Sequence, residues 1–136
     1  MKSLIYAALV AVAAFTAPAL AQQDSNGEGP RCLRLTNING YSVIDRHHVV
    51  LRGGASRHYL VTTRHSCPGL NFGARIATTF GETETICPPM VEYLIPDDGF
   101  RCAIDTIEAV ENVDAARALI DARAAAAAAD DSNGSD

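Results

Sequence analysis

The chain between residues 31 and 111 consists of short apolar runs separated by turn residues, without a long stretch of helical periodicity. In CLRLTNI, for example, Leu33 and Leu35 alternate with polar residues, which is typical of a strand with one buried face. Strands are predicted at residues 32–38, 41–44, 48–51, 58–63, 75–80, 85–87, 91–95 and 100–110.

The connections between these runs are short and rich in turn-forming residues. Asn39-Gly40 is expected to make a tight turn, and Pro96 to Gly99 to join the last two strands, with Pro96 fixing φ and Gly99 accepting a positive φ. Such loops leave no room for the crossover helices that parallel strands need. The sequence therefore predicts an all-β fold, a small antiparallel meander or partly open barrel of about six to eight short strands.

The last quarter of the chain changes character. Asn112 can cap a helix over residues 112–129, and Leu119 and Ile120 give that helix a small apolar face. The alanine run from Ala124 to Ala129 can continue the helix without tertiary contacts, because alanine has the highest helix propensity. Residues 22–30 and 130–136 carry little apolar surface and are predicted to be disordered.

The first 21 residues have the pattern of a secretory signal peptide. Lys2 precedes an apolar run that is short for a bilayer span, and Ala19-Leu20-Ala21 is a small-x-small cleavage site. We expect cleavage after Ala21, a periplasmic or secreted protein, and no stable membrane insertion afterwards. The expected organisation is a signal peptide at 1–21, a disordered segment at 22–30, a β domain at 31–111, a helix at 112–129 and a tail at 130–136.

The charge argues against a nucleic-acid partner. Acidic residues outnumber Lys and Arg by 16 to 11, and the arginines are scattered along the chain rather than clustered. A nucleic-acid-binding domain normally concentrates basic residues on one face. No nucleic acid is therefore expected as a partner. No cofactor is expected either.

Four cysteines, Cys32, Cys67, Cys87 and Cys102, lie in the predicted β domain. In an exported domain of this size they favour two disulfides, which compensate for a modest apolar core. Loop-closure entropy gives about 3 to 4 kcal/mol for each bridge in any of the three pairing schemes. The residues alone therefore leave the pairing open.

RHSCPGL, around Cys67, allows two sharper interpretations. His65 and Cys67 could belong to a metal site, but no second close pair of ligands matches them, and adjacent His47 and His48 would point to opposite faces of a strand. Cys67 could also be a reactive thiol with His65 as its base, although a C-x-x-C motif is missing. A metal-binding or thiol-redox protein centred on His65 and Cys67 is therefore the alternative hypothesis.

The carboxylates give no catalytic constellation. Asp97-Asp98-Gly99 lacks the further oxygen ligands of a calcium loop and is interpreted as a turn. Asp105 follows Ile104 in a strand that should be buried, so we expect a structural role, in which it accepts backbone hydrogen bonds at a β-bulge. No catalytic residue is assigned, and the protein is expected not to be an enzyme.

Several segments together resemble an exported bacterial family, the domain of unknown function family 6491. They are CLRL from Cys32, VIDRHHVVL at 43–51, YLV from Tyr59, SCPGL at 66–70 and RCAIDTIEAV at 101–110. The resemblance implies a bridge between Cys67 and Cys102 and a second between Cys32 and Cys87. It implies no activity or ligand. The alternative pairings are Cys32–Cys67 with Cys87–Cys102, and Cys32–Cys102 with Cys67–Cys87.

The sequence thus favours a small, exported, non-enzymatic β domain that acts as a binding or structural module of the bacterial envelope. A protein partner could bind through an exposed edge of the sheet or through the C-terminal helix.

Overall fold

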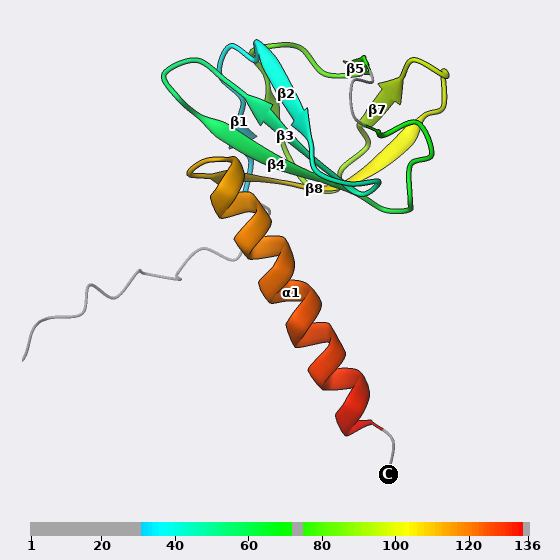
Figure 1. Cartoon of the computed structure of the whole chain (residues 1–136). Coiled ribbons are helices and arrows are strands. Elements are labelled where there is room, and N and C mark those ends of the chain that lie inside the picture. Colours follow the sequence, from blue (N-terminus) through cyan, green and yellow to red (C-terminus); the bar gives the residue numbers. More distant parts are fainter. Residues whose placement is uncertain (1–30, 72–74, 135–136) are drawn as a thin grey trace, which may run out of the picture.

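The structure is a computed structural model that describes residues 31–71 and 75–134. The predicted signal peptide at 1–21 and the segment at 22–30 lie outside the described residues. Within the described ranges, the fold is an antiparallel β domain followed by one helix (Figure 1). The all-β class with a C-terminal helix is therefore confirmed.

Six strands form the larger sheet, and every neighbouring pair is antiparallel. In spatial order they are β2 (Gly40–Val43), β3 (His48–Arg52), β4 (His58–Thr63), β8 (Cys102–Val110), β7 (Tyr93–Pro96) and β5 (Ile76–Thr78). A second, two-stranded sheet pairs β1 (Leu33–Arg34) with β6 (Thr85–Ile86). Seven of the eight strands have bounds within two residues of the predicted runs, because each run has its own alternation and turn residues. The exception is β1, which covers only the first part of the run at 32–38.

The expected tight turn at Asn39-Gly40 is wrong. Gly40 is the first residue of β2, and the Asn39 N–H donates to the carbonyl of Arg52 at 2.9 Å. β1 does not pair with β2 but with β6, about fifty residues later in the chain, so the fold is not a simple meander. The alternation of Leu33 and Leu35 predicts a strand but carries no information about its partner.

The larger sheet curls so that its two outer strands approach each other. The Ile76 N–H, at the start of β5, donates to the hydroxyl of Tyr41 in β2 at 3.2 Å. This contact joins opposite ends of the sheet and gives it the shape of a half-barrel (Figure 1).

Side chains on the concave face form the main core. The fully buried members include Val49 of β3, Val61 of β4, Leu94 of β7 and Ile104 of β8. Leu35, directly after β1, and Ile86 of β6 cover this core. Each of these residues follows the period-two alternation of its strand, so burial of one sheet face and the cover from the second sheet account for the fold.

Helix α1 (Val113–Asn133) packs on the convex face. The side chain of Asn112 caps it by accepting a hydrogen bond from the Ala115 N–H at 2.8 Å, as the sequence predicts. Val50, Leu60 and Ala116 form a second buried cluster between sheet and helix, with Leu119 and Ile120 packed against it. The sheet is thus covered on both faces near β3, β4 and β8.

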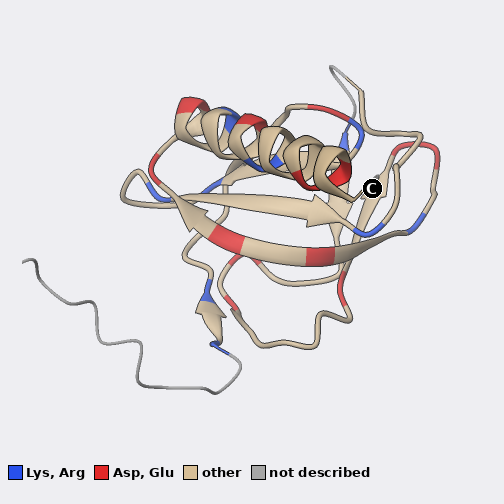
Figure 2. Ribbon diagram, turned by 90° about the horizontal axis from the view of Figure 1, so that it is seen from below, with Lys and Arg blue, Asp and Glu red and all other residues tan. Residues whose placement is uncertain are grey.

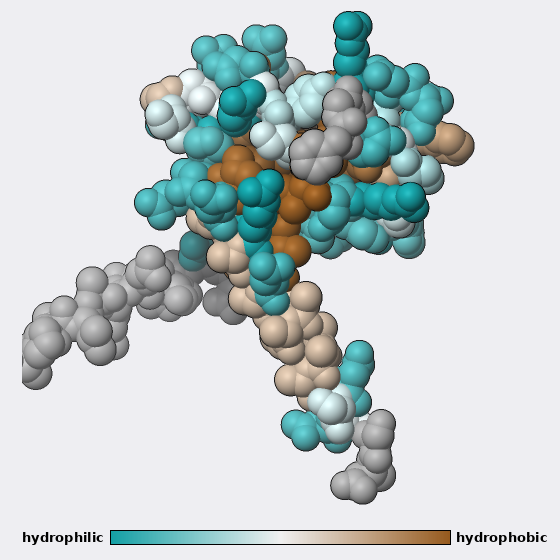
Figure 3. Space-filling view, in the orientation of Figure 1, coloured by the Kyte–Doolittle hydropathy of each residue, from teal (hydrophilic) through white to brown (hydrophobic). Residues whose placement is uncertain are grey.

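From Asp121 onward every described residue of α1 is exposed, and this part of the helix projects from the domain (Figures 1 and 3). The helix extends to Asn133, although residues 130–136 were expected to be disordered. A helix that is already formed propagates at little cost, and the Ser132 hydroxyl adds a hydrogen bond to the Ala129 carbonyl at 2.9 Å. Residues 135 and 136 lie outside the described residues.

The turn between β7 and β8 has the predicted chemistry. Gly99 adopts a φ of 79°, and its N–H donates to the carbonyl of Pro96 at 2.9 Å. A residue with a side chain would be strained there, so Gly99 has the expected structural role.

Candidate functional site

All four cysteines are bonded in pairs. Cys67 is joined to Cys102 and Cys32 to Cys87, the two pairs that the family resemblance implies. The first pair is buried in the core, with exposed fractions of 1% and 8%, whereas the second joins the exposed ends of β1 and β6. Two disulfides are typical of proteins from oxidising compartments.

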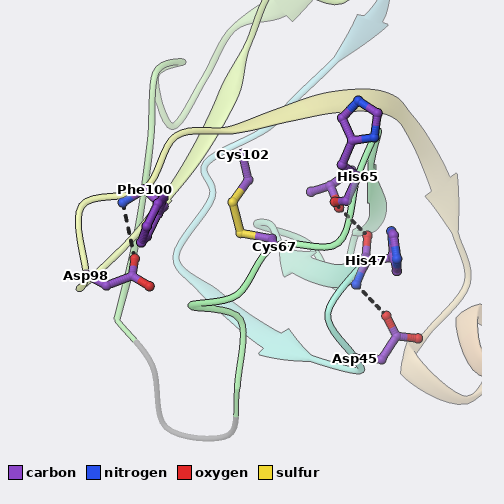
Figure 4. The surroundings of a disulfide bond; sticks show 8 residues. Asp45, His47, His65, Cys67, Asp98, Phe100 and Cys102 are labelled. Carbon is purple, nitrogen blue, oxygen red and sulfur yellow. Dashed lines mark hydrogen bonds between the residues drawn. A yellow bond between two sulfur atoms is a disulfide. The ribbon is translucent and has the colours of Figure 1, made fainter.

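The loop that contains His65 and Cys67 does not form a thiol site. The sulfur of Cys67 is used in the disulfide, and His65 is exposed at the start of the loop (Figure 4). The Thr63 hydroxyl donates to the His65 carbonyl at 2.8 Å and fixes the backbone of this loop. In this oxidised form there is no thiolate for His65 to activate.

The histidines and carboxylates of the described ranges do not assemble a metal site either. No group of three or more His, Cys, Asp or Glu residues there could hold an ion. The Asp97 carboxylate accepts a hydrogen bond from the Arg75 N–H at 3.0 Å, and the Asp98 carboxylate accepts one from the Phe100 N–H at 3.2 Å (Figure 4). These two carboxylates therefore stabilise the β7–β8 turn and the start of β5.

Asp45 forms the best-defined electrostatic cluster. It accepts hydrogen bonds from the backbone N–H groups of His47 at 2.7 Å and His48 at 2.9 Å, and it contacts Nδ1 of His48 at 2.8 Å. Partial burial opposes the ionised form and would raise the pKa of Asp45, but the hydrogen bonds from His47 and His48 outweigh it and lower the pKa below its ordinary value. This is turn chemistry, since each partner lies within three residues.

Asp105 lies at the expected β-bulge. Thr62 pairs with Thr106 and Thr63 with Ile104, so Asp105 is the extra residue of β8. Its side chain is exposed rather than buried in the strand, and among the described residues its carboxylate does not accept the backbone hydrogen bonds that the sequence predicted. The bulge turns this side chain out of the alternation and toward a groove.

We call this hollow the arginine groove; its volume is about 360 Å³. Its polar walls are formed by Arg31, Arg64, Asp105 and Thr106. Its apolar surface is formed by Pro88, Pro89, Met90 and Ile107. The groove lies between the start of β1, the segment after β6 and the bulged part of β8.

Arg64 builds one wall of the arginine groove. Its backbone N–H donates to the Ala103 carbonyl at 2.9 Å, and its guanidinium donates to the Met90 carbonyl at 2.8 Å. Arg31 on the other side is exposed and makes no ion pair among the described residues. Two guanidinium groups thus border a hollow in an acidic protein, whereas over the rest of the ribbon the charges of both signs are dispersed (Figure 2).

A second hollow of about 240 Å³ lies beside the buried disulfide. His65, Phe100 and Arg101 contribute to its walls, and Phe100 remains 59% exposed. The guanidinium of Arg101 stacks over the ring of Tyr93 at 4.7 Å, so it is already paired with an aromatic partner. This hollow is smaller than the arginine groove, and Cys102 and Ala103 in its wall are paired with β7.

Sequence reasoning missed the arginine groove. Its lining residues come from four separate stretches of the chain, Arg31, Arg64, residues 88–90 and residues 105–107. Arg31 lies in no recognisable motif, and Arg64 begins the RHSCPGL stretch, which was interpreted only through His65 and Cys67. The bulge suggested at Asp105 was the single sequence signal near this place.

Fold and disulfides together define a small, disulfide-linked β domain with a C-terminal helix. The chain belongs to the family of unknown function DUF6491, whose family model matches residues 1–126. No curated protein and no solved structure is detectably similar to it. Among the described residues, no helix combines the length and the apolar character needed to cross a lipid bilayer.

Proposed function

We propose that this protein is an exported, non-enzymatic module of the bacterial envelope that binds a partner. The observation that carries the proposal is that both pairs of cysteines are oxidised, with one disulfide in the core and the other at the β1–β6 sheet. Such bridges form and persist outside the reducing cytosol. The signal-like first 21 residues agree with export.

A non-enzymatic role is supported by the chemistry of the polar side chains. Asp45, Asp97 and Asp98 all accept backbone hydrogen bonds from their own turns or from a neighbouring strand. Acid–base catalysis needs a positioned group with a proton to exchange in a pocket. These carboxylates instead fix the conformation of loops by accepting backbone hydrogen bonds, and a binding module needs loops of fixed conformation.

Export and oxidation can be tested together on the full-length chain expressed in a bacterium. The expected product of the periplasmic fraction begins at Gln22, and its intact mass is about four hydrogens below that of the reduced form. A disulfide map should give Cys32–Cys87 and Cys67–Cys102. Retention in the cytosol, or free thiols in the exported protein, would sink the proposal.

The alternative, a metal-binding or thiol-redox protein centred on His65 and Cys67, predicts a different result. Stoichiometric zinc or copper in the exported protein, lost on His65→Ala, would favour it. The bonded and buried state of Cys67 gives it no support.

A further inference from the structure

Strand β8 has an open edge next to the arginine groove. Among the described residues, pairing on its β7 side covers Cys102 and Ala103 and ends with the bond from the Ile104 N–H to the Glu92 carbonyl at 2.9 Å. From Asp105 to Val110, the pairings within the described ranges are all with β4. A strand edge without a partner is a template for another extended chain.

The alternation of hydrogen bonds shows which backbone groups face this open side. The Thr63 N–H donates to the His47 carbonyl at 2.9 Å, which makes Thr62 and His48 a non-hydrogen-bonded pair of β3 and β4. Thr62 therefore bonds to Thr106 of β8, and the next pair along, Val61 and Ile107, is non-hydrogen-bonded. The N–H and C=O of Ile107 thus point away from β4 and toward the open side.

This orientation matters because Ile107 is only 7% exposed. Backbone polar groups in a buried residue are normally paired with protein, water or a ligand. The hydrogen bonds recorded for the described residues give these two groups no partner on the open side. A ligand with its own backbone N–H and C=O would satisfy both.

The side chains around this edge define the chemistry of such a ligand. Met90 and Ile107 offer an apolar floor, and the guanidinium groups of Arg31 and Arg64 offer hydrogen-bond donors that match a carboxylate. Asp105 is the one acidic residue of the groove and would repel an anion. The volume of about 360 Å³ is near the lower limit for ligand sites, which suits a short segment.

We infer that the arginine groove binds a short extended peptide segment of a partner protein. The segment pairs with the open edge of β8 at Ile107, places an apolar side chain on Met90 and Ile107, and presents a carboxylate to Arg31 and Arg64. The carboxylate is either a chain terminus or an Asp or Glu side chain. This inference rests on the proposed binding function and names its site and partner.

The test selects binders from random hexapeptides displayed on phage, using the mature, oxidised protein as bait. We expect enriched peptides to combine a carboxylate with β-branched or other apolar residues. One enriched peptide is then synthesised with a free C-terminus, with an amidated C-terminus, and with its acidic side chains replaced by amides. The form that loses about tenfold in affinity identifies the source of the carboxylate.

Two variants with opposite expected effects test the charges. Arg31→Gln should weaken binding about tenfold, whereas Asp105→Asn should tighten it several-fold, because it removes the repelling charge. Arg117→Gln is the matched control, since Arg117 is an exposed arginine on α1 away from the groove. All three positions are exposed, so folding should be preserved.

Backbone pairing is tested by amide hydrogen exchange and by N-methylation of alternate amides of the peptide. The Ile107 amide should exchange more slowly in the complex, and one of the two methylation patterns should abolish binding. No enriched peptide with a Kd below about 1 mM, or affinity unchanged by both methylation patterns, would overturn the inference. Binding that maps to another surface would also overturn it, while leaving a binding function intact.

Discussion

At the scale of single residues, Gly53 shows how close packing can leave no space for a side chain. It is buried beside β3, and a Cβ built on it would lie 2.5 Å from the backbone carbonyl oxygen of Thr36. Gly53→Ala should therefore destabilise the protein by about 1 to 3 kcal/mol, measured by urea unfolding. Gly81→Ala is the matched control, because its Cβ would meet only the Glu84 carboxylate at 3.7 Å. Equal stability of the two variants would contradict this account.

Asp45 gives a prediction about pH at the same scale. Its folded pKa is lowered, so its ionised form stabilises the fold above the pKa of the unfolded chain, and this contribution is lost as the pH falls through the folded pKa. Asp45→Asn keeps an oxygen acceptor for His47 and His48 but removes the charge. Because the side chain is 46% exposed, we expect a loss of about 0.5 kcal/mol near neutral pH.

The measurement is urea unfolding of both proteins at about pH 7 and about pH 2.5. The difference between them should shrink at the lower pH, because protonation of the folded carboxylate removes the contribution of its charge. A difference of the same size at both pH values would show that the charge of Asp45 contributes nothing.

At the scale of elements, α1 has two parts with different energetics. Its first turns cover Val50 and Leu60, and Arg123 forms an ion pair with Glu108 of β8. The alanines after Arg123 are all exposed and lie in the part of the helix that projects from the domain (Figure 3). Truncation after Arg123 should change the free energy of unfolding by less than about 0.5 kcal/mol. Truncation after Glu111 should cost about 2 to 4 kcal/mol, because it exposes the second apolar cluster. Circular dichroism with urea titration measures both, and similar losses would contradict the division.

At the scale of the whole molecule, the two disulfides differ in access. Cys67 and Cys102 are buried in the core, whereas Cys32 and Cys87 are exposed. Since thiol–disulfide exchange needs access to sulfur, a mild reductant should open Cys32–Cys87 first. Alkylation followed by peptide mass analysis measures the order, and first labelling of Cys67 or Cys102 would contradict it.

Replacing both Cys32 and Cys87 by alanine should lower the free energy of unfolding by about 2 to 4 kcal/mol.

The sequence predicted the local features because each is encoded within a few residues. The run HYLVTT gave β4 with its observed bounds, Asn112 gave the helix cap, and the Pro96 to Gly99 turn gave the positive φ of Gly99. In each case the side chain and the backbone that it controls are neighbours along the chain. The need for disulfides followed from the number of cysteines in a small core.

Only the tertiary structure decided which distant segments meet. β1 could have paired with β2, but a turn in which Asn37 has a φ of 46° separates the two strands. β1 pairs with β6 instead, and the Leu35 N–H donates to the Glu84 carbonyl. The same closure brings Arg31 and Pro88 to the bulge at Asp105, and so creates the arginine groove. Alternation fixes the face that a strand buries, whereas its partner depends on how the whole chain closes around one core, and no short segment contains that information.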